Sequence, residues 1–188
     1  ALKQAGDVGV IAPSIQSSIT LHEQNPMMLN RPTRARMRFY QLLHRSYYLI
    51  CVYELLAAAY HLLRSTVRSS LRWRPLNPQA ASVRASSGID QLGRGRIQIY
   101  APHGACMIFS NEFFARGGGL EVPFFLYGEE IYVAEATRRL GLQVLYDPSV
   151  RLQHDEPQST GLGNVLLSRE AARHLSETTD YLVNTYFS

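Results

Sequence analysis

Two adjacent glutamates and a later histidine are the residues of this sequence whose types and spacing best suit chemistry. Glu129 and Glu130 open a predicted helix over residues 129–140, which Gly141 ends as a C-terminal stop, and His154 follows a predicted strand. The free N–H groups and the dipole at a helix start favour ionised carboxylates. Carboxylates and an imidazole in one site can accept a proton or hold a divalent cation. The alternative is that both glutamates are ordinary first-turn acids.

The elements that must position these residues alternate between strands and helices. Strand-like runs are short and apolar, whereas helical runs repeat their apolar residues every three to four positions. The predicted strands cover residues 8–13 (ended by a proline), 97–100, 105–109, 142–146 and 149–153. The predicted helices cover residues 37–68 (one long helix or two), 111–116, 129–140 and 165–187. A polar connector rich in Gly and Pro spans residues 75–95. This alternation predicts an α/β fold.

Composition sets the class of protein. At 188 residues, with 46% hydrophobic and 10% aromatic content, the chain is long enough for one folded domain with a substantial core. The two cysteines, Cys51 and Cys106, have no C-x-x-C spacing and form no disulfide framework, which predicts a reducing cytoplasm. No signal peptide opens the chain, and we expect Ala1 to be a cut and not a natural start.

The helical segment over residues 37–68 is amphipathic. One side carries apolar residues and the other carries polar ones: Val52, Leu56, Ala59, Leu63 and Val67 against Glu54, His61, Ser65 and Arg68. Residues 47–63 are apolar enough to suggest a membrane span, but Glu54 at the centre would cost about 2.5 to 3.5 kcal/mol, so a span is not predicted. Two interpretations remain open. The helix lies in the plane of an anionic membrane, or its apolar face packs on the domain or on a second subunit of a homo-oligomer.

Arginines are concentrated around this segment. They form two groups: Arg31, Arg34, Arg36, Arg38 and Arg45, then Arg64, Arg68, Arg72 and Arg74. This spacing predicts a surface for an anionic partner, with a solvated basic face as the alternative. Nucleic acid is not predicted as a partner, because the neighbouring aromatic residues fall at helical packing positions and no nucleic-acid motif is present.

A series of short motifs in the second half resembles the C-terminal half of family-2 glycosyltransferases with the GT-A fold. The motifs are APHGACMIFS at 101–110, GGLE at 118–121, FFLYGEE at 124–130, LYDP at 145–148 and the histidine at 154. Their order and intervals match the family, and the HDEPQST run at 154–160 is similar to a bacterial surface-polysaccharide subgroup. The resemblance implies a partial GT-A (Rossmann-like) domain with a mixed sheet and a long amphipathic helical insertion.

The resemblance also implies a reaction: transfer of a sugar, with inversion, from a nucleotide-diphosphate-sugar donor to an acceptor hydroxyl. Glu130 stands at the family's catalytic-base position with Glu129 beside it, and which of them is the base stays open. A neighbouring carboxylate raises the pKa of one member of such a pair. His154 matches a histidine that binds the divalent metal (Mn²⁺ or Mg²⁺) or the diphosphate itself.

Four further residues are implied in ligand binding. His103 and Gly104 match a strand that lines the acceptor and donor-sugar pocket, or form a plain tight turn. Ser159 and Thr160 could donate hydrogen bonds to phosphate, or belong to the entry loop of the last helix. The implied acceptor is a polysaccharide or lipid-linked oligosaccharide, used in the cytoplasm or at the inner membrane face. The rival function is a non-catalytic basic module that docks on membranes or proteins.

The resemblance divides the chain as one partial domain. The expected parts are a mid-domain strand and loop (1–30), the helical insertion (31–75), a connector (76–96), the acceptor and catalytic half (97–160) and a C-terminal helix (161–188). Two departures matter. The family's donor-binding half, with its Asp-x-Asp, would precede Val8, so we expect it to be missing, and Tyr132 stands where many members have a second acid.

Overall fold

A four-stranded mixed sheet forms the base of the molecule in the computed structural model, which describes residues 7–19, 21–70, 95–155 and 168–188. The strand order is β2-β4-β1-β3. The bounds are Val8–Ser17 for β1, Ile97–Ile99 for β2, Ile108–Phe109 for β3 and Gln143–His154 for β4. Strands β1 and β4 run parallel at the centre, and β2 and β3 pair antiparallel at the edges. The predicted α/β class is confirmed.

The central strands are longer than the sequence suggested. The predicted strand at 8–13 does not end at its proline, and the predicted strands at 142–146 and 149–153 are one strand. Pro13 pairs with Asp147, and the next pair joins Ser14 to Arg151, so β4 bulges between them. Proline has no backbone N–H to donate to the neighbouring strand. Because β4 bulges next to Pro13, regular hydrogen bonding is interrupted there, and both strands continue beyond the proline.

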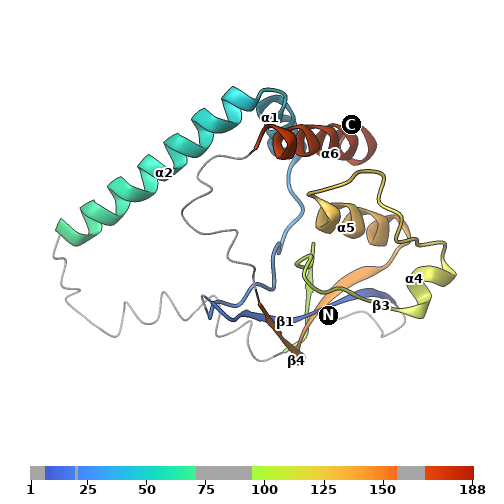
Figure 1. The fold of residues 1–188 in the computed structure, drawn as a ribbon. Helices are drawn as coiled ribbons and strands as arrows, with labels where there is room; N and C mark the ends of the chain where they lie inside the picture. Colours follow the sequence, from blue (N-terminus) through green and yellow to red (C-terminus); the bar gives the residue numbers. More distant parts are fainter. Residues whose placement is uncertain (1–6, 20, 71–94, 156–167) are drawn as a thin grey trace.

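Five helices are described. Their bounds are Arg34–His44 for α1, Tyr47–Ser70 for α2, Asn111–Ala115 for α4, Glu129–Arg139 for α5 and Arg169–Tyr186 for α6. Helix α5 lies above the sheet, α1 and α6 lie above α5, α4 lies to the side near β3, and α2 projects outward (Figure 1). Helix α5 covers the sheet, with Val133 packed among Val10, Phe113 and Val144. Helices α1 and α6 lie beyond α5 and share a second core through Met37 and Leu182.

The helix predictions hold where local signals were strong. Helix α5 ends at the predicted stop, with Gly141 at a φ of 71°, and Ser168 caps α6 by accepting a hydrogen bond from the Ala171 N–H. The long segment at 37–68 is two helices, α1 and α2. The connector at 75–95 lies almost wholly outside the described residues.

Helix α2 extends away from the rest of the chain (Figure 1). Its first turns touch α1 and α6, where Ile50 is buried, and the apolar side chains further along are exposed. Within the part of the chain that the structure describes, no helix has both the length and the apolar character needed to cross a bilayer.

Candidate functional site

Glu130 is positioned by an unusual turn at the start of α5. Gly128 precedes the helix with a φ of 84°, a left-handed conformation that glycine adopts without strain. A Cβ at this position would lie 2.9 Å from Cγ2 of Thr178 and 3.0 Å from Cδ1 of Leu182. The glycine therefore lets the first turn of α5 approach α6 closely, and this approach sets the direction of the Glu130 side chain.

The Glu130 carboxylate meets the backbone of Gly104. The Gly104 N–H donates a hydrogen bond to it, and a Cβ on Gly104 would lie only 2.7 Å from Oε1 of Glu130. Burial raises the pKa of Glu130 and the nearby Glu129 adds to this, although N–H groups of Glu130 and Gly104 act in the opposite direction. The net result is a carboxyl group that binds a proton more tightly than an exposed glutamate.

His103 and His154 lie together at the carboxyl ends of the two parallel strands. Their ring centroids are 6.1 Å apart, and His154 pairs with Ser17 in the last register position of β4 and β1. Buried Asn25 fixes this corner: its Oδ1 accepts from the His103 N–H at 2.8 Å, and its Nδ2 donates to the Pro13 carbonyl at 2.9 Å. In α/β sheets this end of parallel strands is where ligands bind.

Five of the predicted site residues therefore share one neighbourhood. Gly104 touches Glu130, its neighbour His103 lies beside His154, and Glu129 adjoins Glu130 in the first turn of α5. The other two predicted residues, Ser159 and Thr160, lie outside the described residues. The Gly104 contact also distinguishes the two glutamates, because Glu130 alone makes it in the described part of the chain.

A cavity of about 690 Å³ opens beside Glu130, within the size range of small-molecule sites. Most of its wall is apolar, with side chains such as Met28, Met37 and Ile131. Two basic side chains, Arg36 and His44, are also at its edge. Burial lowers the pKa of His44, so this ring is neutral at pH 7 and Arg36 supplies the positive charge.

The described residues do not build a metal site by themselves. Among them, no three His, Cys, Asp or Glu side chains lie close enough together to hold an ion. Nδ1 of His154 instead lies 3.1 Å from the Gln24 amide oxygen. His154 would hold Mn²⁺ or Mg²⁺ only together with ligands outside the described residues, and the divalent metal stays a prediction.

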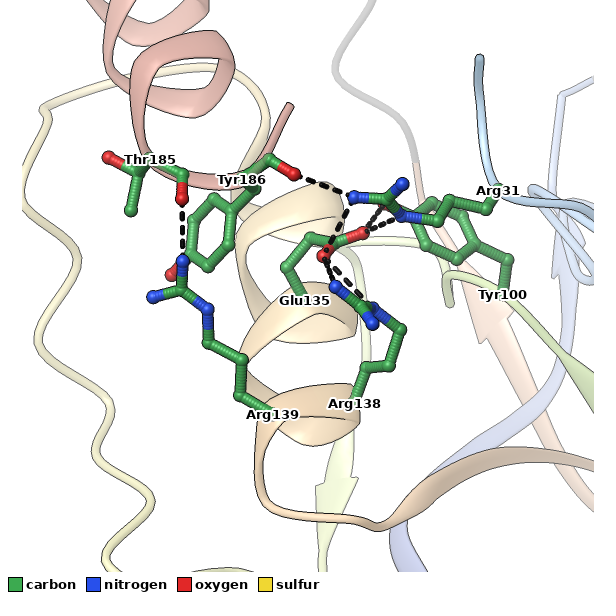
Figure 2. Close-up of polar contacts among 7 residues, drawn as sticks. All are labelled: Arg31, Tyr100, Glu135, Arg138, Arg139, Thr185 and Tyr186. Carbon is green, nitrogen blue, oxygen red and sulfur yellow. Dashed lines mark hydrogen bonds and ion pairs between the residues drawn. The ribbon is translucent and has the colours of Figure 1, made fainter. Parts of the chain in front are cut away.

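A buried carboxylate that the sequence did not indicate lies one turn further along α5. The Glu135 side chain is fully buried and accepts hydrogen bonds from Arg31 Nε at 2.6 Å, Tyr100 Oη at 2.9 Å and Arg138 Nη2 at 2.9 Å (Figure 2). Burial opposes ionisation of Glu135, but these donors outweigh it and lower its pKa. Arg31 is an exposed residue of the predicted basic group, and its guanidinium also forms an ion pair with this buried carboxylate.

Tyr132 packs where the family pattern has an acid. Its ring lies 5.9 Å from that of Phe124, and its hydroxyl donates to the Glu121 carbonyl at 3.0 Å. The side chain thus holds the 121–128 loop against α5.

Comparison with known proteins does not assign this chain to a family. No family model matches the chain, and searches of curated proteins and of solved structures find no similar protein. The function of the chain is therefore inferred from the residues of the site and their geometry.

Replacing Gly104 by alanine is expected to displace the Glu130 carboxylate without unfolding the protein. The new Cβ would meet only the end of a flexible side chain at 2.7 Å, which can move away and lose the Gly104 N–H bond. We expect a higher Glu130 pKa, measured by NMR titration of the side-chain carboxyl, and a change in unfolding free energy below about 1 kcal/mol.

Gly119→Ala is the matched control, because a Cβ at Gly119 has nothing within 4 Å. It should leave the Glu130 titration unchanged. An unchanged titration in the Gly104 variant would contradict the contact described above.

Proposed function

We propose that this chain belongs to a glycosyltransferase in which Glu130 is the base that activates an acceptor hydroxyl. One observation carries the proposal: a half-buried carboxylate with a raised pKa stands at the wall of a cavity large enough for a substrate. A base whose pKa has moved towards neutrality accepts a proton more readily than an exposed glutamate does. The motif series from residue 101 to 154 supports sugar transfer as the reaction class.

The proposed step balances as an inverting substitution. The acceptor oxygen attacks the anomeric carbon of a nucleotide-diphosphate sugar, and its proton passes to the Glu130 carboxylate. The bond between the anomeric carbon and the diphosphate oxygen breaks, and the nucleoside diphosphate leaves with that electron pair. Glu129, beside it in the same turn, adds negative charge that favours protonation of Glu130.

The cavity supports an acceptor with both apolar and anionic parts. Its wall combines apolar side chains with the Arg36 guanidinium, as a lipid-linked oligosaccharide or an anionic glycan would require. Donor binding needs further groups, because the sequence contains no Asp-x-Asp to hold a metal and a diphosphate. The two unpaired cysteines, Cys51 and Cys106, agree with a cytoplasmic reaction at the inner membrane face.

Donor turnover tests the proposal. The longest available form of the protein, including any residues encoded before Ala1, is mixed with UDP-, GDP- and dTDP-sugars and MnCl₂, and released nucleoside diphosphate is measured. We expect slow hydrolysis of one donor class, accelerated by an acceptor glycan. Failure of that protein to bind or cleave any donor would overturn the proposal.

A further inference from the structure

Helix α2 carries an apolar face that the described residues leave exposed. Six apolar side chains of its first three turns are 40% to 69% exposed: Tyr48, Leu49, Val52, Tyr53, Leu55 and Leu56. At 100° per residue they share one arc of about 160° around the helix. Glu54, the only charged residue between positions 47 and 63, lies outside this arc. These side chains form one apolar strip that faces away from the core, on the side of the helix opposite buried Ile50.

The same surface continues onto α1. Phe39 and Leu42 are 51% and 60% exposed, and the Phe39 ring lies 6.3 Å from that of Tyr53 on α2. We call the six α2 side chains together with Phe39 and Leu42 the docking face. Along α2 it runs from Tyr48 to Leu56, a stretch of about 13 Å at 1.5 Å per residue.

Arginines border the docking face. Arg34 and Arg38 are exposed and lie one turn apart on α1, next to the Phe39 and Leu42 strip. Among the described residues, neither arginine takes part in an ion pair with an acidic side chain. No Asp or Glu occurs between Glu23 and Glu54, so the field over this surface is positive throughout.

We propose that the docking face binds in the plane of an anionic lipid bilayer, with the apolar arc in the headgroup and acyl boundary and the arginines among the lipid phosphates. An apolar arc bordered by basic residues is the pattern of helices that lie on anionic membranes. A second copy that presents the same docking face complements this surface poorly, because the docking face and its bordering arginines include no acidic side chain. The proposal does not depend on sugar transfer.

Flotation of the unaltered protein with lipid vesicles tests whether the docking face binds an anionic bilayer. We expect binding to phosphatidylcholine vesicles that contain phosphatidylglycerol, little binding to phosphatidylcholine alone, and release as salt rises from low to high concentration. Arg34→Gln and Arg38→Gln should each weaken the partition coefficient about fivefold. Leu49→Ser, Val52→Ser and Leu56→Ser together should weaken it at least tenfold.

Arg151→Gln with Arg173→Gln is the matched control, because both arginines are exposed but lie on β4 and α6. This variant removes two positive charges, one more than either single substitution on α1, and should still bind vesicles like the unaltered protein. Glycerol phosphate at millimolar concentration should not compete, which separates a bilayer surface from a site for single phosphate groups.

A tryptophan probe reports docking without removing the apolar face. In a Trp73→Phe background, Leu56→Trp should show a blue shift of its emission when anionic vesicles are added. Absence of that shift, or equal flotation of the triple serine variant and the unaltered protein, would overturn the proposal. So would concentration-dependent self-association that the triple variant abolishes, since this outcome would assign the docking face to a second copy.

Discussion

Replacing Glu135 by alanine is expected to lower the free energy of unfolding by about 2 to 3 kcal/mol. The side chain is fully buried, and it is the shared acceptor for Arg31, Arg138 and Tyr100. Its removal leaves the Tyr100 hydroxyl and the partly buried Arg31 guanidinium without their acceptor, whereas the largely exposed Arg138 can turn to water. Breaking one partner out of such a buried network destabilises far more than the loss of a surface ion pair.

The substitution should weaken the packing of α6 on α5 as well, because the Glu135 network joins segments far apart in sequence (Figure 2). Arg31 also donates to the Tyr186 carbonyl at 2.7 Å, and its guanidinium lies 4.2 Å from the centre of the Phe187 ring. Arg139, which follows Arg138 on α5, donates a hydrogen bond to the Thr185 carbonyl. The end of α6 is thus held on α5 by the same group of arginines.

Urea unfolding followed by circular dichroism measures the effect, and Glu112→Ala is the control. Glu112 pairs with Arg116 one helical turn away, but both side chains are largely exposed, so its loss should stay below about 1 kcal/mol. Equal losses in the two variants would show that the Glu135 network contributes no more than a surface pair.

The dependence of folding stability on pH is a second measurement of the Glu135 network. The pKa of Glu135 is lower in the folded protein than its ordinary value of 4.5, because its donors outweigh the effect of burial. A carboxyl with a lowered folded pKa stabilises the protein above its unfolded pKa, and this stabilisation is lost as pH falls through the folded value. Below pH 4.5, the unaltered protein should therefore lose stability more steeply than Glu135→Gln.

Local sequence signals predicted the helices well and the strands less well. Helix α5 needed only its first-turn acids and Gly141, and both signals lie within the segment itself. The length of β1 depended on its partner instead. Proline usually ends a strand, and only the bulge in β4 opposite Pro13 allows the pairing to continue to Ser17.

In the candidate site too, local sequence patterns indicated some residues, whereas contacts between distant residues were not predictable. Adjacent residues and motif spacing drew attention to Glu130 and His154, and the structure brings Gly104 and His103 to them. The Arg31–Glu135 pair gave no such signal. Its members are 104 positions apart, and nothing in the sequence around Arg31 indicates that the fold places a buried carboxylate against it.

Glu130→Gln is expected to reduce sugar transfer by about 10² to 10⁴-fold, the usual contribution of a general base. Glutamine keeps the size and the hydrogen-bonding oxygen of the side chain but cannot accept the acceptor proton. Steady-state release of nucleoside diphosphate measures the loss as a fall in kcat. Glu129→Gln, the neighbouring control in the same turn, should retain most of the activity, and an equal or larger loss there would assign the base to Glu129.

Stability separates a catalytic role of Glu130 from a merely structural one. Its folded pKa is raised, mainly by burial, so the folded state binds this proton more tightly than the unfolded state does. For such a carboxyl, folding stability is highest below the unfolded pKa and falls as pH rises through the folded pKa. At pH 7 the ionised side chain therefore opposes folding, and Glu130→Gln should raise Tm while it lowers activity. The gain should disappear at pH 4, where the natural side chain is also neutral, and a loss of Tm at pH 7 would show that Glu130 serves the fold.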